Sequence, residues 1–328
     1  MIAKGKMKPR FQKKRWIFLG IITVIVFLVW LNNTNVFYSG GQGYKLLAHR
    51  GLAQTYDASK TDWNTNTAAI IDEPEHEYLE NTIPSMQVAF DYGADVVEFD
   101  VKLSSDKILA VFHDSPIEYR TGVEGEVGDY TMEELKTLDI GYGYTADGGK
   151  TFPFRGKGVG LMPTIDEVFF AFPDKEFLIH VKDGNVETYE VLWKKLSTLS
   201  EERLAQLTVY GDDEGIGYLR KQSPSLRLLS MAMLKKALID YELVGFLGYV
   251  PESMHNMELH IPLKYAKFLW GWPHKFVKRM EAVNTRVVIV QGSGRVSEGF
   301  DTIESLDSIP DKYDGFVWTN RIDRTRSE

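Results

Sequence analysis

The stretch Leu46-Leu47-Ala48-His49-Arg50-Gly51 is an apolar run that ends in a histidine, an arginine and a glycine. A short apolar run that is closed by a glycine predicts a buried strand, here over residues 45–49. The polar residues then mark the point where the strand stops and a loop begins. A histidine in this position is more often structural than catalytic, so the stretch alone predicts the strand and no chemistry.

Three further pieces follow the same rule, with polar groups at or near the end of short apolar runs. They are Glu80-Asn81-Thr82, then Val96-Val97-Glu98-Phe99-Asp100-Val101, then Val111-Phe112-His113-Asp114. Parallel strands would bring these ends to one edge of a sheet, where two histidines, several carboxylates and an arginine would gather. Such a gathering is typical of an active site rather than of a packed core.

Glu98 and Asp100 are two residues apart on a predicted strand, so their side chains leave the same face. Two carboxylates on one face repel each other unless a cation lies between them, and oxygen ligands of this kind suit Mg²⁺ or Ca²⁺. The chain has no cysteine that could form a soft-metal site. The alternative is a pair of solvated acids on an edge strand, but the apolar residues on either side favour a buried strand.

These motifs, in this order, resemble those of glycerophosphodiester phosphodiesterases. Thr131-Met132-Glu133-Glu134-Leu135 resembles the family's helix after that region, and the chain closes on the strand-like Gly315-Phe316-Val317-Trp318-Thr319. The resemblance is dense between residues 46 and 182 and becomes thinner afterwards. It implies a TIM barrel fold.

The resemblance also implies roles for single residues. His49 and His113 would be the general acid and base that act on a phosphodiester. Glu98 and Asp100 would hold the divalent metal. Arg50 would neutralise phosphate charge, and Glu80 would bind or orient a neighbour in the site.

The sequence departs from the family's pattern at His180, where the family has a glutamate that completes the metal site. His180 then either ligates the metal, which would favour Mn²⁺ or Zn²⁺, or bonds a water on it. Lys182 matches the family's lysine and would meet the phosphate as a point charge.

Strands that alternate with helices predict parallel βα units, and the pattern gives eight strands. The predicted strands are 45–49, 95–103, 108–113, 176–182, 207–210, 226–230, 286–291 and 315–319. The predicted helices are 81–92, 131–138, 163–172, 186–199, 233–246 and 273–284. The expected fold class is α/β, a TIM (β/α)8 barrel preceded by a single N-terminal transmembrane helix.

Residues 16–31 form an uncharged, almost wholly apolar run that seven basic residues precede. As a helix it spans roughly 24 Å, a little short of a ~30 Å hydrocarbon core, and residues up to 38 can extend it. The basic cluster predicts a cytoplasmic N-terminus. A cleaved signal peptide is the alternative, but no small-residue cleavage site follows the run.

The expected organisation is a basic cytoplasmic segment (1–15), a transmembrane anchor (16–38), a linker (39–44) and an extracytoplasmic TIM-barrel phosphodiesterase domain (45–328) on the plasma membrane. No acidic residue occurs before Asp57, so the body is more acidic than the formal net charge of −8 indicates. That acidity argues against nucleic acid as a partner.

Two long segments have open roles. The loop 52–79 carries Tyr56, Trp63 and His76, and it either shapes the mouth of the barrel or is a surface excursion. Residues 249–272 look like an irregular insertion that is rich in aromatic and basic residues. Its aromatic side chains either pack beneath it or contact lipid.

The resemblance therefore implies metal-dependent hydrolysis of a glycerophosphodiester to an alcohol and glycerol phosphate by histidine acid–base catalysis. The substrate would be a small molecule or a lipid-headgroup phosphodiester. One alternative is a lysophospholipase D or phospholipase-type phosphodiesterase that acts on membrane lipid. The other is a barrel that binds phosphate but has lost turnover.

Overall fold

Eight parallel strands form a nearly closed barrel wall in the computed structural model, which describes residues 9–41, 43–57, 61, 65–294, 298–311 and 313–325, with side chains from residue 13 on. Their order around the wall is β6-β5-β4-β2-β1-β9-β8-β7, and a parallel bridge between Leu228 and Met257 joins the two ends. The wall strands are β1 (Lys45–His49), β2 (Val96–Leu103), β4 (Glu176–Val181), β5 (Leu207–Tyr210), β6 (Arg227–Leu229), β7 (Glu258–Pro262), β8 (Arg286–Val290) and β9 (Phe316–Thr319). The predicted TIM barrel is confirmed.

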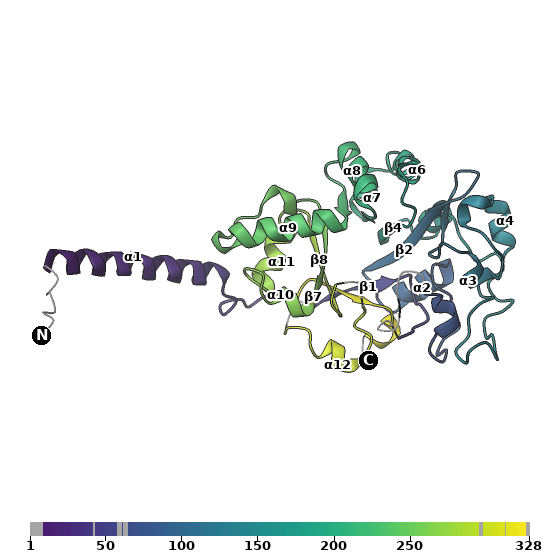
Figure 1. Ribbon diagram of the computed structural model, residues 1–328, viewed down its shortest axis with the longest axis horizontal. Helices are drawn as coiled ribbons and strands as arrows, with labels where there is room; N and C mark the ends of the chain where they lie inside the picture. Colours follow the sequence, from purple (N-terminus) through teal and green to yellow (C-terminus); the bar gives the residue numbers. More distant parts are fainter. Residues whose placement is uncertain are drawn as a thin grey trace, which may run out of the picture.

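Helices surround this wall and connect its strands (Figure 1). The α-helices of the barrel are α2 (Ile83–Asp91), α3 (Glu118–Thr121), α4 (Met132–Thr137), α5 (Ile165–Ala171), α6 (Val186–Leu196), α7 (Glu201–Ala205), α8 (Asp213–Gln222), α9 (Met231–Val244), α10 (Leu263–Ala266), α11 (His274–Glu281) and α12 (Ile303–Leu306). Short 3-10 helices are η2 (Thr67–Ile70), η3 (Val127–Asp129), η4 (Gly245–Leu247), η5 (Glu252–Met254) and η6 (Ile322–Arg324).

The prediction of a third wall strand over 108–113 is wrong. The strand there, β3 (Leu109–Val111), runs antiparallel to β2 and lies off the wall path. The connection between β2 and β3 is a short turn in which the Ser104 amide donates to the Ile108 carbonyl. A parallel crossover needs about a dozen residues or more. The connection between β2 and β3 is much shorter, so it can form only a hairpin.

The missing wall strand is β7, which lies inside the segment 249–272 that was expected to be irregular. Its inward positions are polar and buried. Nε2 of His260 lies 2.8 Å from a Glu258 carboxylate oxygen, and Arg286 on β8 donates to the other oxygen of Glu258 at 3.0 Å. Because Glu258 and His260 take two of its five positions and Pro262 ends it, the short strand β7 offers too few apolar residues to be recognised as a wall strand.

Most other predicted elements are confirmed, with ends shifted by a few residues. The predicted capping box of α4 is present, since Thr131 and Glu134 exchange side chain to backbone hydrogen bonds. Helix α8 was not predicted, because its sequence contains two glycines and few apolar residues. Asp212 begins it by accepting hydrogen bonds from the amides of Glu214 and Gly215.

The hydrophobic core has an inner and an outer layer. Inside the wall, apolar side chains of β1, β2, β4, β8 and β9 pack together, with Leu47 and Val288 among them. A larger layer fills the space between the wall and the helices. A separate cluster lies under the insertion 104–164 between β2 and α5, and the loop 52–79 packs on it through Ala68 and Ile71.

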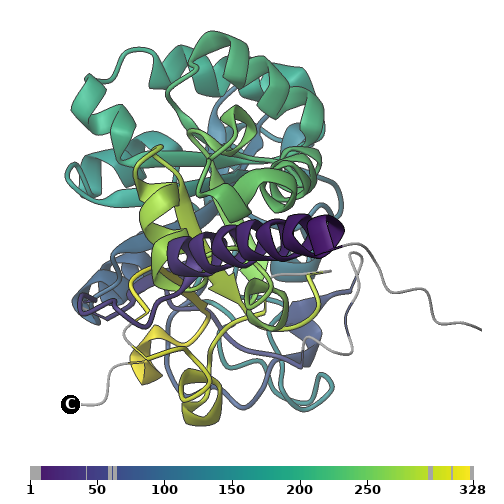
Figure 2. The ribbon, with the colours of Figure 1, turned by 90° about the vertical axis from the view of Figure 1, so that its left-hand side faces the viewer.

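A long N-terminal helix, α1 (Pro9–Asn33), projects from the barrel at the end opposite the insertion that carries α3 and α4 (Figure 1). Viewed from that end, α1 crosses in front of the part of the barrel built around α9 and α11 (Figure 2). Residues 13–33 are long and apolar enough to cross a membrane, by length and composition. The helix ends at Asn33, so residues 34–38 are not helical, and residues 1–8 of the predicted basic segment lie outside the described residues.

Candidate active site

The candidate residues meet at the carboxyl ends of three neighbouring wall strands. In the register of the sheet, His49 on β1 lies beside Glu98 on β2. Asp100, two residues further along β2, lies beside His180 on β4. Because alternate residues of a strand face the same way, Glu98, Asp100 and His180 point into the barrel mouth together.

His49 is held by Asn320, which comes directly after β9. Its Nδ1 lies 2.6 Å from Oδ1 of Asn320, and Nδ2 of Asn320 donates to Asp301 at 2.7 Å. Since the Asp301 carboxylate accepts, the amide oxygen faces the imidazole, so Nδ1 carries the proton. Nε2 is left as a free base 3.9 Å from Glu98. Burial, with Arg50 beside it, holds the pKa of His49 well below its usual range.

His113 reaches the site from the loop after β3, not from a wall strand. Its Nδ1 lies 2.7 Å from Asp114, which accepts at 2.5 Å from Nε of Arg120. Burial, together with Arg50 and Lys182, lowers the pKa of His113 to about 4. The two histidines therefore differ in their partners: a neutral amide for His49 and a carboxylate for His113.

Arg50 lies under the site and is almost completely buried. Its Nη1 donates to Glu80 at 2.7 Å, its Nε lies 3.1 Å from Asp100, and its amide donates to Glu98 at 3.1 Å. The backbone reverses at this point, with φ of 57° at Arg50 and 78° at Gly51. A Cβ at Gly51 would lie 2.6 Å from the backbone of Ser85, so the turn requires glycine.

Glu80 and Arg120 link the two halves of the site. A Glu80 oxygen accepts from Arg50 and lies 3.3 Å from Arg120, which also stacks over the ring of Tyr144. The cavity beside them is lined by residues of the insertion, His113 among them, and by Glu80 and Asn81. Tyr56 of the loop 52–79 is half-buried near Arg50, and burial raises its pKa. This part of the loop therefore adjoins the mouth, whereas Trp63 lies outside the described residues.

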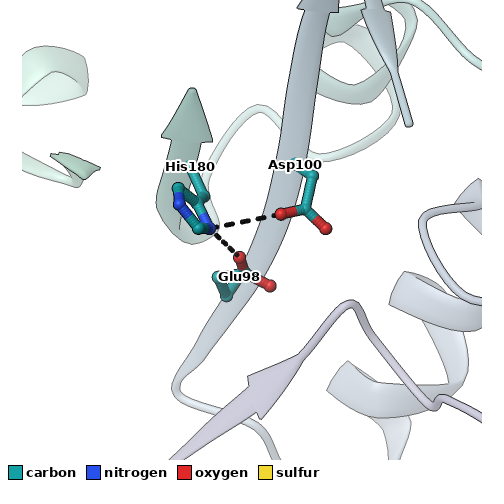
Figure 3. A group of neighbouring side chains, drawn as sticks. All are labelled: Glu98, Asp100 and His180. Atoms are coloured by element: carbon teal, nitrogen blue, oxygen red, sulfur yellow. Dashed lines mark ion pairs between the residues drawn. The ribbon is translucent and has the colours of Figure 1, made fainter. Parts of the chain in front are cut away.

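Glu98, Asp100 and His180 form a group that could hold a metal ion (Figure 3). Nδ1 of His180 lies 3.2 Å from Oδ1 of Asp100 and 3.5 Å from Oε1 of Glu98. Both of these oxygens are buried and have no hydrogen-bond partner among the described residues. Buried acceptors without donors are costly unless a cation satisfies them, so the donor set fits a divalent ion.

The electrostatics of this group are those of closely spaced acids. Burial and the neighbouring Asp100 raise the pKa of Glu98 well above its usual range. Burial opposes ionisation of Asp100 too, but Arg50 and His113 hold its pKa well below the usual value. Burial and Lys182 lower the pKa of His180 to about 4, so its ring is neutral at neutral pH. A neutral ring is the form that ligates metal.

Lys182 lies at the rim of this group, with its Nζ 4.0 Å from Asp100. The ring of His180 stacks on the ring of Tyr210, with the two ring centroids 4.2 Å apart. All eight residues singled out in the sequence thus lie in one region. Sequence reasoning missed Asn320 and Arg120. Asn320 could have been found, since it directly follows the last strand and so lies at the same edge of the sheet as His49, which ends the first strand. No pattern marks Arg120.

Comparison with known proteins gives one family. The model of the glycerophosphoryl diester phosphodiesterase family matches residues 49–284. The sequence is 33% identical over 153 residues to a glycerophosphodiester phosphodiesterase of Caldanaerobacter subterraneus subsp. tengcongensis, which covers 45% of this chain and 59% of the relative. It is 28% identical over 193 residues to lysophospholipase D GDPD1 of Mus musculus, with 57% of this chain and 58% of the relative covered. The chain thus spans less than two thirds of the length of these relatives.

Solved structures support the fold. A glycerophosphodiester phosphodiesterase from Agrobacterium tumefaciens aligns with a TM-score of 0.55 at 19% identity, over 86% of this chain and 99% of that one. The glycerophosphoryl diester phosphodiesterase domain of a Mycobacterium tuberculosis protein aligns with a TM-score of 0.57 at 14% identity, over 86% and 97% of the two chains.

Proposed function

The chain belongs to the glycerophosphoryl diester phosphodiesterase family, and we propose that it hydrolyses a glycerol-based phosphodiester to an alcohol and glycerol phosphate. The observation that carries this proposal is the convergence of two differently held histidines on a buried group of metal-binding type. His49 and His113 approach Glu98 and Asp100 from different elements, with Arg50 beneath them. A core-packing role would not require so many buried charges in one place.

The two histidines would divide the proton transfers. His49 donates Nδ1–H to Asn320 and keeps Nε2 free, which suits it to accept a proton from the attacking hydroxyl. Asp114 stabilises the protonated ring of His113, which suits His113 to protonate the leaving alcohol. The bound phosphodiester is an anion, and it would raise the pKa of His113 from its value in the free site.

Glu98, Asp100 and His180 would hold a divalent cation, which supplies charge neutralisation and polarisation of the phosphoryl oxygens when bound. Lys182 would contact a phosphate oxygen at the rim as a point charge. Arg50 is already paired with Glu80 and Asp100, so its main contribution would be to compensate the acids and orient them.

A second candidate substrate is a lysophospholipid. The similarity to lysophospholipase D GDPD1 and the apolar helix α1 favour it. The same residues would act on the same diester bond, with an acyl chain on the glycerol. A barrel that binds phosphate without turnover is the remaining alternative, which the histidine at the third ligand position favours.

We further propose that α1 anchors the barrel to the plasma membrane in a single pass. The basic residues ahead of Trp16 favour a cytoplasmic N-terminus, which leaves the barrel outside the cytoplasm. Residues 13–33 have the length and composition of such a span.

The experiment that tests this function uses the full chain in detergent micelles. Glycerophosphocholine and lysophosphatidylcholine are each offered with Mg²⁺, with Ca²⁺ and with a chelator, and the His49→Ala variant is the matched control. Release of choline from glycerophosphocholine that stops with chelator supports the proposal. Turnover of the lysolipid alone would favour the second candidate. Phosphodiester binding without turnover of either substrate would favour the third.

A further inference from the structure

Exposed apolar side chains surround the point where α1 leaves the barrel. Each is between 59% and 74% exposed, and together we call them the apolar rim: Val36, Phe37, Leu243, Leu247, Tyr249 and Phe268. Single exposed apolar residues are common on protein surfaces, but a group of large ones around one point usually marks an interaction surface.

Hydrogen bonds and ring packing bring these segments together. The side-chain amides of Asn32 and Asn33 donate to the Phe246 carbonyl at 3.3 and 2.8 Å, next to Leu247. The Phe246 ring packs on Trp270 at 6.0 Å, and Nε1 of Trp270 donates to the Glu242 carbonyl at the end of α9. The rim is therefore continuous with the carboxyl end of α1.

The barrel also caps α1 with cations. Arg279 donates to the Asn32 carbonyl at 2.9 Å, and Lys275 donates to the Leu31 carbonyl at 2.8 Å. The last carbonyls of a helix lack partners within the helix and carry partial negative charge, so these contacts are favourable. Asn35 continues the junction by donating to the Gly271 carbonyl at 3.2 Å. The helix and the barrel thus meet at a fixed junction rather than through a free tether.

The charge of the segment that carries Phe268 suits a lipid surface. Residues 259–280 contain no acidic residue. Lys264 and Lys267 are exposed, and their ammonium groups lie over the rings of Tyr265 and Phe268 at 5.1 and 5.2 Å. Lysines that flank aromatic side chains are typical of segments that rest in the headgroup region of a membrane.

The junction lies at the opposite end of the barrel from the candidate active site. The Tyr38 hydroxyl donates to Asp314, just before β9, and the Lys45 amide donates to the Gly315 carbonyl. These contacts are at the amino ends of β1 and β9, whereas His49 lies at the carboxyl end of β1. The insertion 104–164, which borders the site, accordingly lies far from α1 (Figure 1).

We propose that the apolar rim rests in the headgroup region of the bilayer that α1 spans, and that the mouth of the barrel therefore opens away from that bilayer. The substrate is then a water-soluble glycerophosphodiester and not a lysolipid of the same membrane. This inference rests on the anchor and the hydrolase function proposed above.

The test places single fluorescent labels on the full chain, whose lack of cysteine makes each introduced thiol unique. The rim variants are Leu247→Cys and Phe268→Cys. Val26→Cys reports on α1, and Phe170→Cys is the matched control, an apolar side chain of α5 that is 90% exposed. Each labelled protein is reconstituted into vesicles of phosphatidylcholine and phosphatidylglycerol that contain a spin-labelled lipid quencher.

Emission from the rim labels and from position 26 should fall roughly twofold or more, because lipid surrounds an interfacial apolar side chain, while position 170 is unaffected. If the label at position 26 is quenched while the rim labels, like the label at position 170, are not, the rim does not rest in the headgroup region and the proposal is overturned. Rim labels that are shielded from water but not quenched by lipid would also overturn it, and would indicate a second protein copy. If position 26 is not quenched, the anchor itself is wrong and the inference fails with it.

The orientation is tested by activity in the same vesicles. Glycerophosphocholine in solution should be hydrolysed, and lysophosphatidylcholine held in the bilayer should be spared at least about tenfold relative to detergent, where either substrate reaches the mouth. Equal lysolipid turnover in vesicles and in detergent would overturn the orientation. Hydrolysis of glycerophosphocholine in detergent but not in vesicles would overturn it too, because the mouth would then be blocked. No turnover of either substrate in either medium would refute the hydrolase function and the substrate inference with it, while the labels would still decide the position of the rim.

Discussion

Asn320 accepts a hydrogen bond from Nδ1 of His49 at 2.6 Å, and this contact decides which nitrogen of His49 faces the site. Replacing Asn320 with Ala should let the ring choose the other tautomer and rotate, so kcat should fall about tenfold or more while KM changes little. Steady-state kinetics on glycerophosphocholine measures this. Asn320→Asp should raise the pKa of His49 and move the acidic limb of the pH profile upward. An unchanged kcat in both variants would mean that Asn320 only caps the end of β9.

Replacing either His49 or His113 with Ala should reduce turnover by about 10²–10⁴-fold, the usual contribution of a positioned proton carrier. The fold should persist, because both rings are partly exposed at the mouth. Circular dichroism checks the fold, and His255→Ala, outside the site, is the control. Activity within a few-fold of the parent in both variants would show that these histidines are structural.

Replacing His180 with Glu should tighten Mg²⁺ or Ca²⁺ binding, since a third carboxylate adds charge to the ligand set. His180→Gln, which offers an oxygen without charge, is the matched control. Calorimetric titration of each protein with Mg²⁺, Ca²⁺, Mn²⁺ and Zn²⁺ measures the affinities directly. If His180 ligates through nitrogen, the parent should prefer Mn²⁺ or Zn²⁺ more strongly than the Glu variant does. The same affinities in all three proteins would place the metal elsewhere.

His113 should make the protein less stable in acid. Its pKa is about 4 in the folded chain against an ordinary value of 6.5, so the unfolded chain takes up the proton first. The free energy of unfolding should therefore be kept above about pH 6.5 and decrease as the pH falls towards about 4. Urea denaturation of the parent and of His113→Gln, at about pH 7 and about pH 5, tests this. The variant should lose less stability than the parent, and an equal loss would contradict the assignment.

The proposed topology predicts that protease added to intact cells reaches the barrel and leaves the first residues protected. The basis is the basic cluster before Trp16 together with the apolar helix that follows it. Immunoblots with tags at each end of the full chain would report the fragments. A barrel that resists protease until the membrane is opened would contradict the topology.

Much of the barrel could be predicted because strands buried on both faces read as apolar runs, as in β8 and in the apolar part of β1. The errors have physical causes. β3 is apolar like a wall strand, but its short connection makes it a hairpin. β7 is a wall strand whose buried positions carry Glu258 and His260, so its pattern looks irregular. A pattern of apolar residues in the sequence indicates which apolar side chains are buried. It does not indicate which charged side chains are paired inside a barrel.

Some residues of the candidate site could likewise be predicted from the sequence, and others could not. His49, Glu98 and Asp100 end or line strands and could be placed from their spacing. Arg120 lies on a short helix of the insertion and reaches Asp114 and Glu80 only through tertiary packing. Which oxygens lack partners, and which tautomer a ring adopts, depends on contacts between segments far apart in the chain.

The bridge between Leu228 and Met257 has a consequence for where the barrel wall opens locally. Elsewhere ladders of paired residues join the wall strands, but at this seam the sheet is held by that bridge and by bonds to the Asn256 carbonyl from the Leu228 amide and the Arg220 guanidinium. Among the described residues few hydrogen bonds hold the wall together at this seam, so thermal fluctuations should part the wall there readily. The strands that carry His49, Glu98 and Asp100 lie across the barrel from the seam. Tyr210, which stacks on His180, pairs with Leu229 of β6 and lies 6.1 Å from the ring of His260 on β7, so motion at the seam would reach the candidate site first through His180.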